Sequence, residues 1–123
     1  MLNFVYVFLG GGLGSLCRYS IARWMVNHRL DFPLATFIAN VLACLILGYL
    51  VSLKVNNNVA AHWQLVFMTG FCGGFSTFST FTAETFLLFE EGMNFMGLLY
   101  IATSLLVCLG SLYLGLRLGS SSF

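Results

Sequence analysis

The sequence predicts an all-α membrane protein, with four transmembrane helices in a single domain that covers residues 1–123. Of the 123 residues, 59% are hydrophobic and only 7% are charged, whereas soluble domains contain roughly 25% charged residues. Four apolar stretches, at about 3–25, 34–53, 64–90 and 95–117, are each long enough to cross a bilayer. The loops between them are too short for a soluble domain, so we expect no enzyme and a function within the membrane or at its faces.

Charge and cysteine usage narrow the class further. The net charge is +1 and there is no run of Lys or Arg, which argues against a nucleic-acid partner. The four cysteines, Cys17, Cys44, Cys72 and Cys108, lie inside the predicted spans and show no CxxC spacing. We therefore interpret them as small apolar packing residues, not as a metal cluster or a disulfide framework.

The first stretch, residues 3–25, combines small residues with a cation. Gly10 and Gly14 of the GGGLGS segment stand four residues apart, a spacing that allows membrane helices to approach closely. Arg18 lies in the second half of the stretch, where a charge is costly. Its long side chain could extend to the nearby interface, or it could have a buried acceptor or face an anion, and the sequence favours neither interpretation.

The second stretch, residues 34–53, follows Pro33, a residue suited to the first turn of a helix. Asn40 is the only strongly polar side chain near its middle. An amide has two N–H donors and one acceptor oxygen, which all need partners at that depth. A hydrogen bond to another helix is one interpretation, and a donor lining an anion path is the other.

The third stretch, residues 64–90, contains the segment GFCGGFSTFSTF, residues 70–81. Adjacent glycines destabilise a helix, so Gly73 and Gly74 predict a break whose freed backbone groups find partners outside the helix. Broken helices near the membrane midplane commonly form ion sites. Glu84, nearer the end of the stretch, is expected to cap the helix or to pair locally, with a basic residue of a neighbouring helix as a candidate partner.

Helical spacing places aromatic and hydroxyl residues of the third stretch on two faces. The aromatic face contains Phe71, Phe75, Phe78, Phe86 and Phe89, with Phe81 beside them. The opposite face contains Thr77, Thr80 and Glu84, flanked by Ser76 and Ser79. A ring edge is the positive end of the ring's quadrupole, so phenylalanines presented edge-on can solvate a small anion. Hydroxyl and amide donors could replace further hydration waters, so these residues permit an anion path.

The fourth stretch, residues 95–117, makes the number of crossings even, so both termini are expected on the side of Lys54. That side also carries Arg117, and the other side carries Arg29 and Arg23. Orientation follows the difference in Lys and Arg between the two sides, and here the count is close to a tie. A tie is compatible with insertion both ways up, and thus with an antiparallel homodimer, or with a fixed orientation set by other factors.

These motifs together resemble the small fluoride channel family called Fluc or CrcB. GFCGGFSTFSTF is close to the third-span signature of that family. Further matches are GGGLGSLCRY in the first stretch, P-x-x-T-x-x-x-N from Pro33 to Asn40, and LLYIATS from Leu98 to Ser104. The resemblance covers essentially the whole chain and implies a passive channel that exports fluoride across the bacterial inner membrane. It also implies a dual-topology antiparallel homodimer of four-helix subunits with two parallel fluoride pathways.

The resemblance implies roles for particular residues. Phe78 and Phe81 would contact fluoride through their ring edges, and Asn40 would be the amide donor of the pore. A polar track would continue through Ser79, Thr80, Tyr100 and Ser104. Beyond Ser104 the track is open to question, because one helical turn further on the chain has Cys108, where another hydroxyl is possible.

Two further roles are implied for the backbone and for the first stretch. The carbonyl groups of Gly73 and Ser76, with their copies in a second subunit, would hold a structural sodium ion at the dimer centre. Arg18 would attract anions in a vestibule.

Two other functions compete with the channel. A small dual-topology proton-coupled exporter of organic cations would need a membrane-embedded acidic residue in the first stretch, where this sequence has Arg18. A purely structural assembly subunit would leave the glycine break unexplained.

Overall fold

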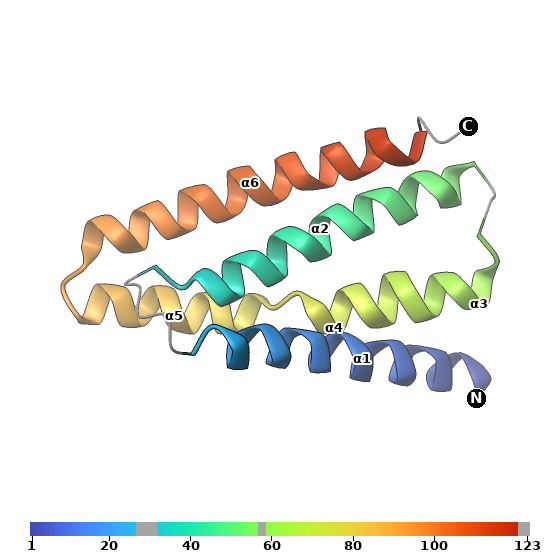
Figure 1. The fold of residues 1–123 in the computed structure, drawn as a ribbon, viewed down its shortest axis with the longest axis horizontal. Coiled ribbons are helices and arrows are strands. Elements are labelled where there is room, and N and C mark those ends of the chain that lie inside the picture. Colours follow the sequence, from blue (N-terminus) through green and yellow to red (C-terminus); the bar gives the residue numbers. More distant parts are fainter. Residues whose placement is uncertain (27–31, 57–58, 121–123) are drawn as a thin grey trace.

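Helices form all the regular structure in the computed structural model, which describes residues 1–26, 32–56 and 59–120. The elements are α1 (Leu2–Trp24), α2 (Leu34–Val55), α3 (Ala61–Gln64), the π-helix η1 (Leu65–Cys72), α4 (Gly73–Phe75), α5 (Phe78–Glu90) and α6 (Asn94–Ser120). The elements α3, η1, α4 and α5 follow one another along a single crossing, so the helices occupy the four predicted stretches (Figure 1). The predicted all-α class is therefore confirmed in the described ranges.

The composition of the helices is that of a multi-pass membrane protein. α1, α2 and α6 are each long and apolar enough to cross a membrane, whereas the third crossing is divided into shorter pieces. The start of α1, the end of α2, the start of α3 and the end of α6 lie at the same end of the molecule (Figure 1). Lys54 and Arg117 lie in the last turns of α2 and α6, and Arg23 lies in the last turn of α1. Arg29 lies outside the described residues.

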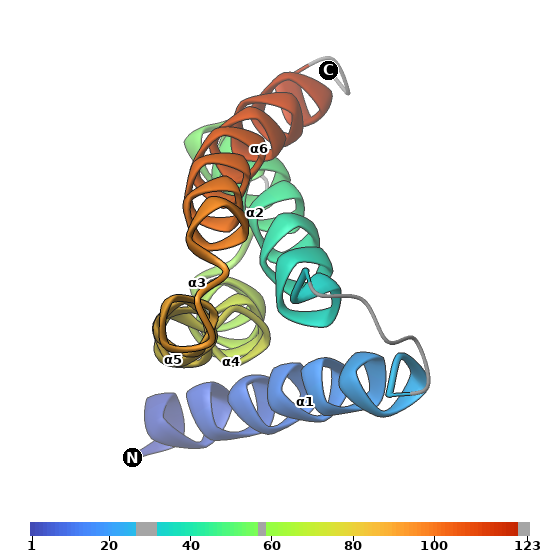
Figure 2. The ribbon, with the colours of Figure 1, turned by 90° about the vertical axis from the view of Figure 1, so that its left-hand side faces the viewer.

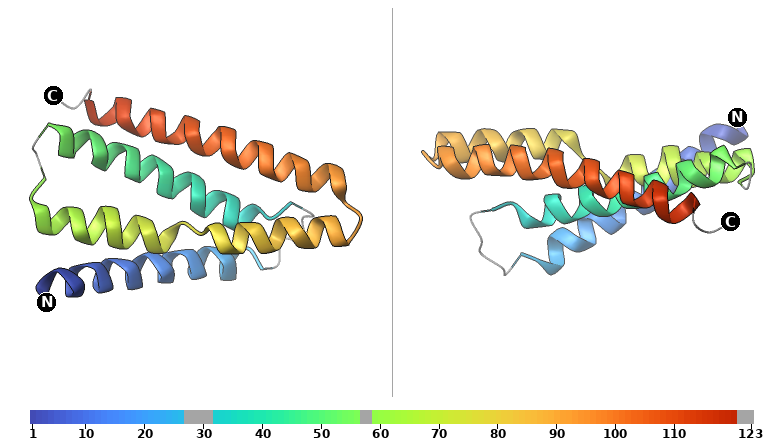
Figure 3. Two further views of the ribbon diagram at one scale, coloured as in Figure 1. Left: turned by 180° about the vertical axis from the view of Figure 1, so that it is seen from behind. Right: turned by 90° about the horizontal axis from the view of Figure 1, so that it is seen from above.

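The third crossing lies between α1 on one side and the α2–α6 pair on the other (Figure 2). It is broken, as the sequence predicts, but the position predicted from Gly73 and Gly74 is wrong. Both glycines are helical, and the extended residues are Ser76 (φ −75°, ψ 155°) and Thr77 (φ −150°, ψ 121°). The extended link between α4 and α5 is visible from behind (Figure 3).

Close packing, not backbone freedom, explains the second of these glycines. A Cβ atom built at Gly74 would overlap the carbonyl oxygen of Gly11 in α1. One turn earlier, Gly70 lies equally close to the backbone at Gly10. Glycines therefore allow the third crossing to touch α1 backbone to backbone, and the chain leaves the helix only after this contact ends.

The small-residue spacing of α1 has the predicted effect. Gly10 and Gly14 are both buried, and a Cβ at either position would overlap a backbone oxygen, of Val66 and Phe71 respectively. Such contacts are how helices associate in a membrane, where the hydrophobic effect supplies little attraction between them.

Close contacts between glycines and the backbone also join α2 to α6. A Cβ at Gly48 would overlap the carbonyl oxygen of Leu112, and a Cβ at Gly115 would overlap that of Leu45. These two helices run in the same direction along their length (Figure 1). The α2–α6 pair is therefore a tightly packed unit that faces the broken crossing.

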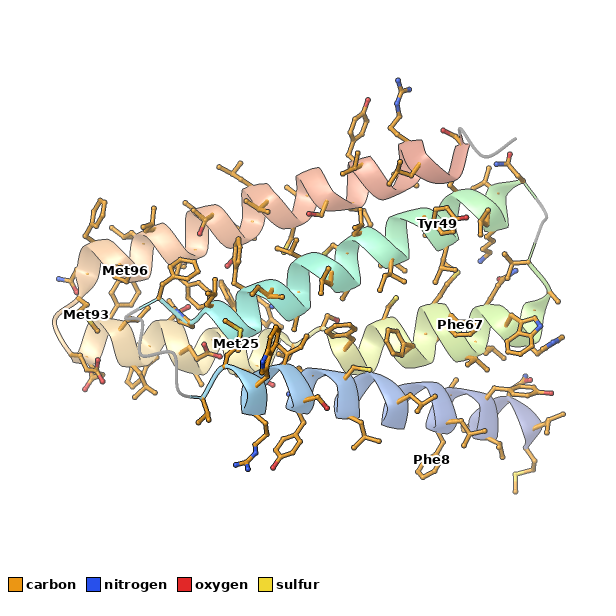
Figure 4. The ribbon with its side chains drawn as sticks, in the orientation of Figure 1. Phe8, Met25, Tyr49, Phe67, Met93 and Met96 are labelled. Atoms are coloured by element: carbon orange, nitrogen blue, oxygen red, sulfur yellow. The ribbon has the colours of Figure 1, made fainter. Side chains whose placement is uncertain are left out.

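Large apolar side chains lie mostly on the outside. The buried core is small: Ala39, Ala43 and Phe75 form one cluster, and Cys72, Leu88 and Tyr100 are the other buried apolar residues in the described ranges. In contrast, Phe4 and Phe8 of α1 are 77% and 78% exposed, and Phe8 extends away from the other helices (Figure 4). An apolar exterior around a core of small residues fits a lipid environment.

Candidate functional site

The break in the third crossing is held by a side chain of another helix. The Thr77 N–H donates to Asn40 Oδ1 at 2.8 Å, and Asn40 Nδ2 donates to the Thr77 carbonyl oxygen at 3.2 Å. Asn40 thus supplies both backbone groups of one extended residue with partners, which is what a break inside a membrane requires. The interpretation of Asn40 as an interhelical hydrogen-bonding residue is confirmed. One N–H of its amide remains for another acceptor.

Several backbone carbonyl groups lose their helical donors at the break, among them those of Gly73 and Ser76. In a continuous helix the Thr77 N–H would bond to Gly73 and the Thr80 N–H to Ser76. Here the first goes to Asn40, and the second goes to Thr77 Oγ1 at 3.2 Å, which caps α5. The carbonyl groups of Gly73 and Ser76 are the two that the sequence analysis assigned to a sodium ion.

A cavity of about 230 Å³ opens beside the break, between α2, the link and α6. We call it the break cavity. Its lining combines hydroxyl, amide and thiol groups with two aromatic rings. The lining residues are Asn40, Cys44, Ser76, Thr77, Phe78, Phe81, Ser104, Leu105 and Cys108. The structure therefore brings together Asn40, Phe78, Phe81 and Ser104 among the predicted pore residues.

The two predicted pore phenylalanines lie side by side in this wall. Their ring centroids are 5.7 Å apart with the planes tilted by 36°. Phe81 also contacts the ring of Tyr100, at 5.0 Å and 54°. Tilted rings present edges as well as faces to their surroundings, and the edge carries the positive end of the quadrupole.

The continuous aromatic face predicted for the third stretch is wrong, because the break interrupts the helical periodicity between Phe75 and Phe78. Phe75 is buried in the core and packs edge-on against Phe71 at 5.4 Å. Phe78 is 77% exposed and belongs to the next helix. Phe71 and Phe75, before the break, pack inside the subunit, and Phe78 and Phe81, after it, line the break cavity.

α6 contributes two buried hydroxyl groups, those of Tyr100 and Ser104. Tyr100 is fully buried against Phe81 and Phe32, and Ser104 is 6% exposed in the wall of the break cavity. Neither hydroxyl makes a well-formed hydrogen bond in the described part of the chain, and that of Tyr100 lies beside Thr36 and Glu84. Unpaired hydroxyl groups at such depth are costly, so these two are suited to a guest that accepts hydrogen bonds.

The remaining predicted track residues lie elsewhere. Ser79 is exposed, with its hydroxyl 3.3 Å from that of Thr77. Thr80 faces a second cavity of about 230 Å³ that Arg18 also lines. Arg18 Nε donates to the carbonyl oxygen of Gly74 at 3.3 Å. Arg18 therefore has an acceptor inside the protein, just before the break, and this favours the second of its two interpretations.

Glu84 pairs with a hydroxyl group, not with a basic residue. Thr36 of α2 donates from Oγ1 to Glu84 Oε1, so a cation partner is not required to hold the carboxyl group in place. Thr36, Thr80 and Glu84 line a further cavity of about 320 Å³. Because Thr36 and Thr80 also line the cavity of Arg18, polar groups extend along this side of α5.

Three residues of the site were not assigned to it from the sequence. Thr77 was placed on the hydroxyl face, and Cys44 and Cys108 were interpreted as packing residues. Thr77 anchors the break, and Cys44 and Cys108 line the break cavity. A signal existed for the cysteines, because each stands one helical turn after a predicted site residue, Asn40 or Ser104.

Residues 5–116 match the family described as "CrcB-like protein, Camphor Resistance (CrcB)". A relative from Pyrococcus horikoshii, named "Fluoride-specific ion channel FluC", is 43% identical over 108 residues, which is 87% of each chain. A relative of the same name from Oceanobacillus iheyensis is 38% identical over 119 residues, 96% of this chain and 92% of its own. One from Methylobacillus flagellatus, also of that name, is 36% identical over 121 residues, 96% of this chain and 94% of its own. With its broken third crossing and whole-length similarity to these proteins, the chain belongs to the CrcB-like protein family.

Proposed function

We propose that this protein is a passive, fluoride-selective channel that exports cytoplasmic fluoride and thereby confers resistance to it. Relatives of nearly the same length carry the name "Fluoride-specific ion channel FluC". The observation that carries the proposal in this chain is the break cavity. Its lining combines aromatic rings with hydroxyl and amide groups, and among the described residues it includes no Asp, Glu, Lys, Arg or His. Such a lining suits a small anion that must exchange its water for close donors.

The proposed pathway begins at the break cavity. Phe78 and Phe81 contact the ion through ring edges, and Asn40 donates its second amide N–H. The unpaired hydroxyl groups of Tyr100 and Ser104 donate from α6, which would satisfy them. Ser79 and Thr80 continue the polar track on α5, and Arg18 attracts anions in a vestibule on the side that Thr80 faces.

The direction of flow follows from acid–base chemistry. Hydrogen fluoride is neutral and crosses membranes in acidic surroundings, and it dissociates in the more neutral cytoplasm. The anion is then trapped there, because a charge crosses hydrocarbon poorly. In a passive channel, a membrane potential that is negative inside drives the anion out, so neither a nucleotide nor a coupling ion is needed.

We further propose that the protein acts in the bacterial inner membrane as an antiparallel, dual-topology homodimer with two fluoride pathways. A structural sodium ion fits the carbonyl groups of Gly73 and Ser76, both of which have lost their helical donors to side chains. A Cβ at Gly73 would meet nothing within 4 Å, so this residue lies on an uncovered side of the chain. A second subunit placed there would add its own pair of carbonyl groups, and the bound cation would balance their partial charges.

The alternative function, proton-coupled export of cations, has weaker support. Such a transporter needs an acidic group that binds proton and cation in turn, and α1 carries Arg18 where that group is expected. Glu84 is bonded to Thr36 and lies away from the lining of the break cavity. The fluoride channel therefore accounts for more of the described polar groups.

The test is fluoride efflux from liposomes that contain the purified protein, with potassium ionophore present so that charge does not accumulate. We expect rapid fluoride loss and no chloride loss, whereas protein-free liposomes lose neither ion. If folded dimers release no fluoride, the channel is refuted and the exporter and the structural subunit become the leading functions. The same liposomes prepared without sodium test the cation site, because sodium removal should slow the efflux.

A further inference from the structure

Two thiol groups that the proposed fluoride pathway does not use lie in the wall of the break cavity. Cys44 of α2 and Cys108 of α6 both line this cavity. Their side chains are close enough to interact with each other. Both are free thiols and both are half-buried. They are therefore neither fully buried in the core nor fully exposed on the outside.

Helix packing explains why these thiols meet. α2 and α6 run in the same direction and touch through Gly48 and Gly115, whose positions leave no room for a Cβ atom. Cys44 stands one turn before Gly48, and Cys108 stands one turn before Leu112, the residue that Gly48 contacts. The glycine contact therefore fixes the distance between the helices at the level of the two sulfur atoms.

We propose that Cys44 and Cys108 form a binding site for a soft, two-coordinate d¹⁰ metal ion such as Hg²⁺, in the wall of the break cavity. Thiolate ligands select soft metals over the hard cations that oxygen ligands prefer. No group of three or more His, Cys, Asp or Glu among the described residues is placed to hold a metal ion. A pair of thiols therefore suits metal ions that bind two ligands in a linear arrangement.

The reaction is a simple exchange without oxidation or reduction. Each S–H bond breaks, each sulfur forms a bond to mercury, and two protons leave for the surrounding water. Two thiolates neutralise the charge of Hg²⁺, so the complex places no net charge inside the membrane, where charges are costly. The unpaired hydroxyl of Ser104, one turn from Cys108 and in the same wall, adds a polar neighbour for the site.

Occupation of this site has a consequence for ion flow that rests on the proposed function. The metal would lie in the same cavity as Asn40, Phe78 and Phe81. If fluoride passes through that cavity, a bound ion the size of Hg²⁺ obstructs it. We therefore expect Hg²⁺ to inhibit the channel through these two thiols.

The first measurement is metal retention, which does not depend on transport. Purified protein is incubated with Hg²⁺, a small monothiol is added to remove singly bound metal, and the mercury that remains after gel filtration is measured. We expect about one Hg²⁺ per chain, because two thiols held at fixed positions bind far more tightly than one. Cys44→Ser and Cys108→Ser should each fail to retain mercury. Cys44→Ala and Cys108→Ala check that the loss of retention is not caused by the new serine hydroxyl.

Matched controls come from the other two cysteines. Cys17 is exposed on α1. Cys72 is buried, lines a neighbouring cavity together with Cys44 and is close enough to interact with it, so Cys72→Ser tests whether the metal uses that pair instead. Cys17→Ser and Cys72→Ser should retain about as much mercury as the wild type. Wild-type protein that retains none, or variants of Cys44 and Cys108 that retain it fully, would overturn the site.

The second measurement is fluoride efflux with and without Hg²⁺, each variant compared with its own untreated rate. Hg²⁺ should slow fluoride efflux at least about tenfold in the wild type and in Cys17→Ser. It should slow efflux less than about twofold in Cys44→Ser and Cys108→Ser, because only an occupied pore is obstructed. Mercury retained by a protein that never transports fluoride would refute the channel and leave the metal site standing. Mercury retained without inhibition of an active channel would overturn the obstruction.

Discussion

The two halves of the third crossing use the same kinds of residue for opposite purposes. Before the break, η1 and α4 touch α1 backbone to backbone, and the phenylalanine at the end of this half, Phe75, is buried in the core. After the break, α5 turns Phe78 and Phe81 toward a cavity, with Phe78 largely exposed. The first half therefore packs the subunit together, and the second half borders a cavity.

This difference shows how a membrane protein can open a helix without losing its fold. The first half is anchored by contacts between glycines, which leave no space for water or a ligand. At the end of that anchor, Asn40 and Thr77 replace the missing helical hydrogen bonds. The break is thus held by side chains of α2 and of the link itself.

The largest expected effect is the loss of the anchor. Gly14→Val would force a side chain against the backbone of Phe71, which cannot move without displacing the third crossing. We expect the free energy of unfolding to fall by about 3 kcal/mol or more, at the upper end for overpacking. The measure is the fraction of detergent-extracted protein that elutes as a single species.

Gly12→Ala is the matched control for this substitution, because a Cβ at Gly12 meets nothing within 4 Å. Alanine favours a helix by up to about 1 kcal/mol over glycine, so this variant should be as stable as the wild type or more so. If Gly14→Val remains as stable as Gly12→Ala, the backbone contact does not anchor the subunit.

The next largest effect concerns the polar hold on the break. Asn40→Leu would leave the N–H and the carbonyl oxygen of Thr77 unpaired in the membrane, at a cost of about 2 kcal/mol. Asn40→Asp keeps an acceptor for the N–H and should lose less. Denaturant titration in detergent measures the stability of both variants. Equal stability of Asn40→Leu and Asn40→Asp would argue against a role for Asn40 in holding the break.

A smaller effect, on ion flow, is expected from the rings after the break. Phe78→Ile and Phe81→Ile remove the ring edges and keep an apolar side chain, so the dimer should still assemble. We expect fluoride efflux to fall about tenfold in each, which corresponds to about 1.4 kcal/mol in the barrier. Normal efflux in both variants would remove the ring-edge mechanism, and Phe86→Ile, which does not line the break cavity, is the control.

The sequence predicts well those features that depend on local spacing. Four apolar stretches gave the helices, and the four-residue spacing of Gly10 and Gly14 gave the contact of α1. Asn40 was recognisable because a lone amide in a membrane helix must find a partner. The similarity over residues 5–116 bears out the family resemblance.

Features that depend on contacts between helices could not be predicted in the same way. The break was expected at Gly73 and Gly74, yet the contact of Gly74 with α1 keeps both helical and moves the break to Ser76 and Thr77. That shift ended the helical periodicity on which the aromatic face depended. The partner of Glu84 was likewise a hydroxyl from another helix, which the sequence of α5 alone does not specify.

The smallest effect distinguishes the cap of α5 from an ordinary hydroxyl on the same helix. Thr77→Val removes the oxygen that accepts from the Thr80 N–H, and loss of such a cap costs about 1 kcal/mol. Thr82→Val removes a hydroxyl that bonds only within its own helix, to the Phe78 carbonyl oxygen, and should change stability by less than about 0.5 kcal/mol. If the two substitutions are equivalent in denaturant titration, α5 does not depend on its cap. Thr77→Val alone could also lower stability and slow fluoride efflux. In that case the start of α5 determines where Phe78 and Phe81 lie, because both residues follow Thr77 within about one helical turn.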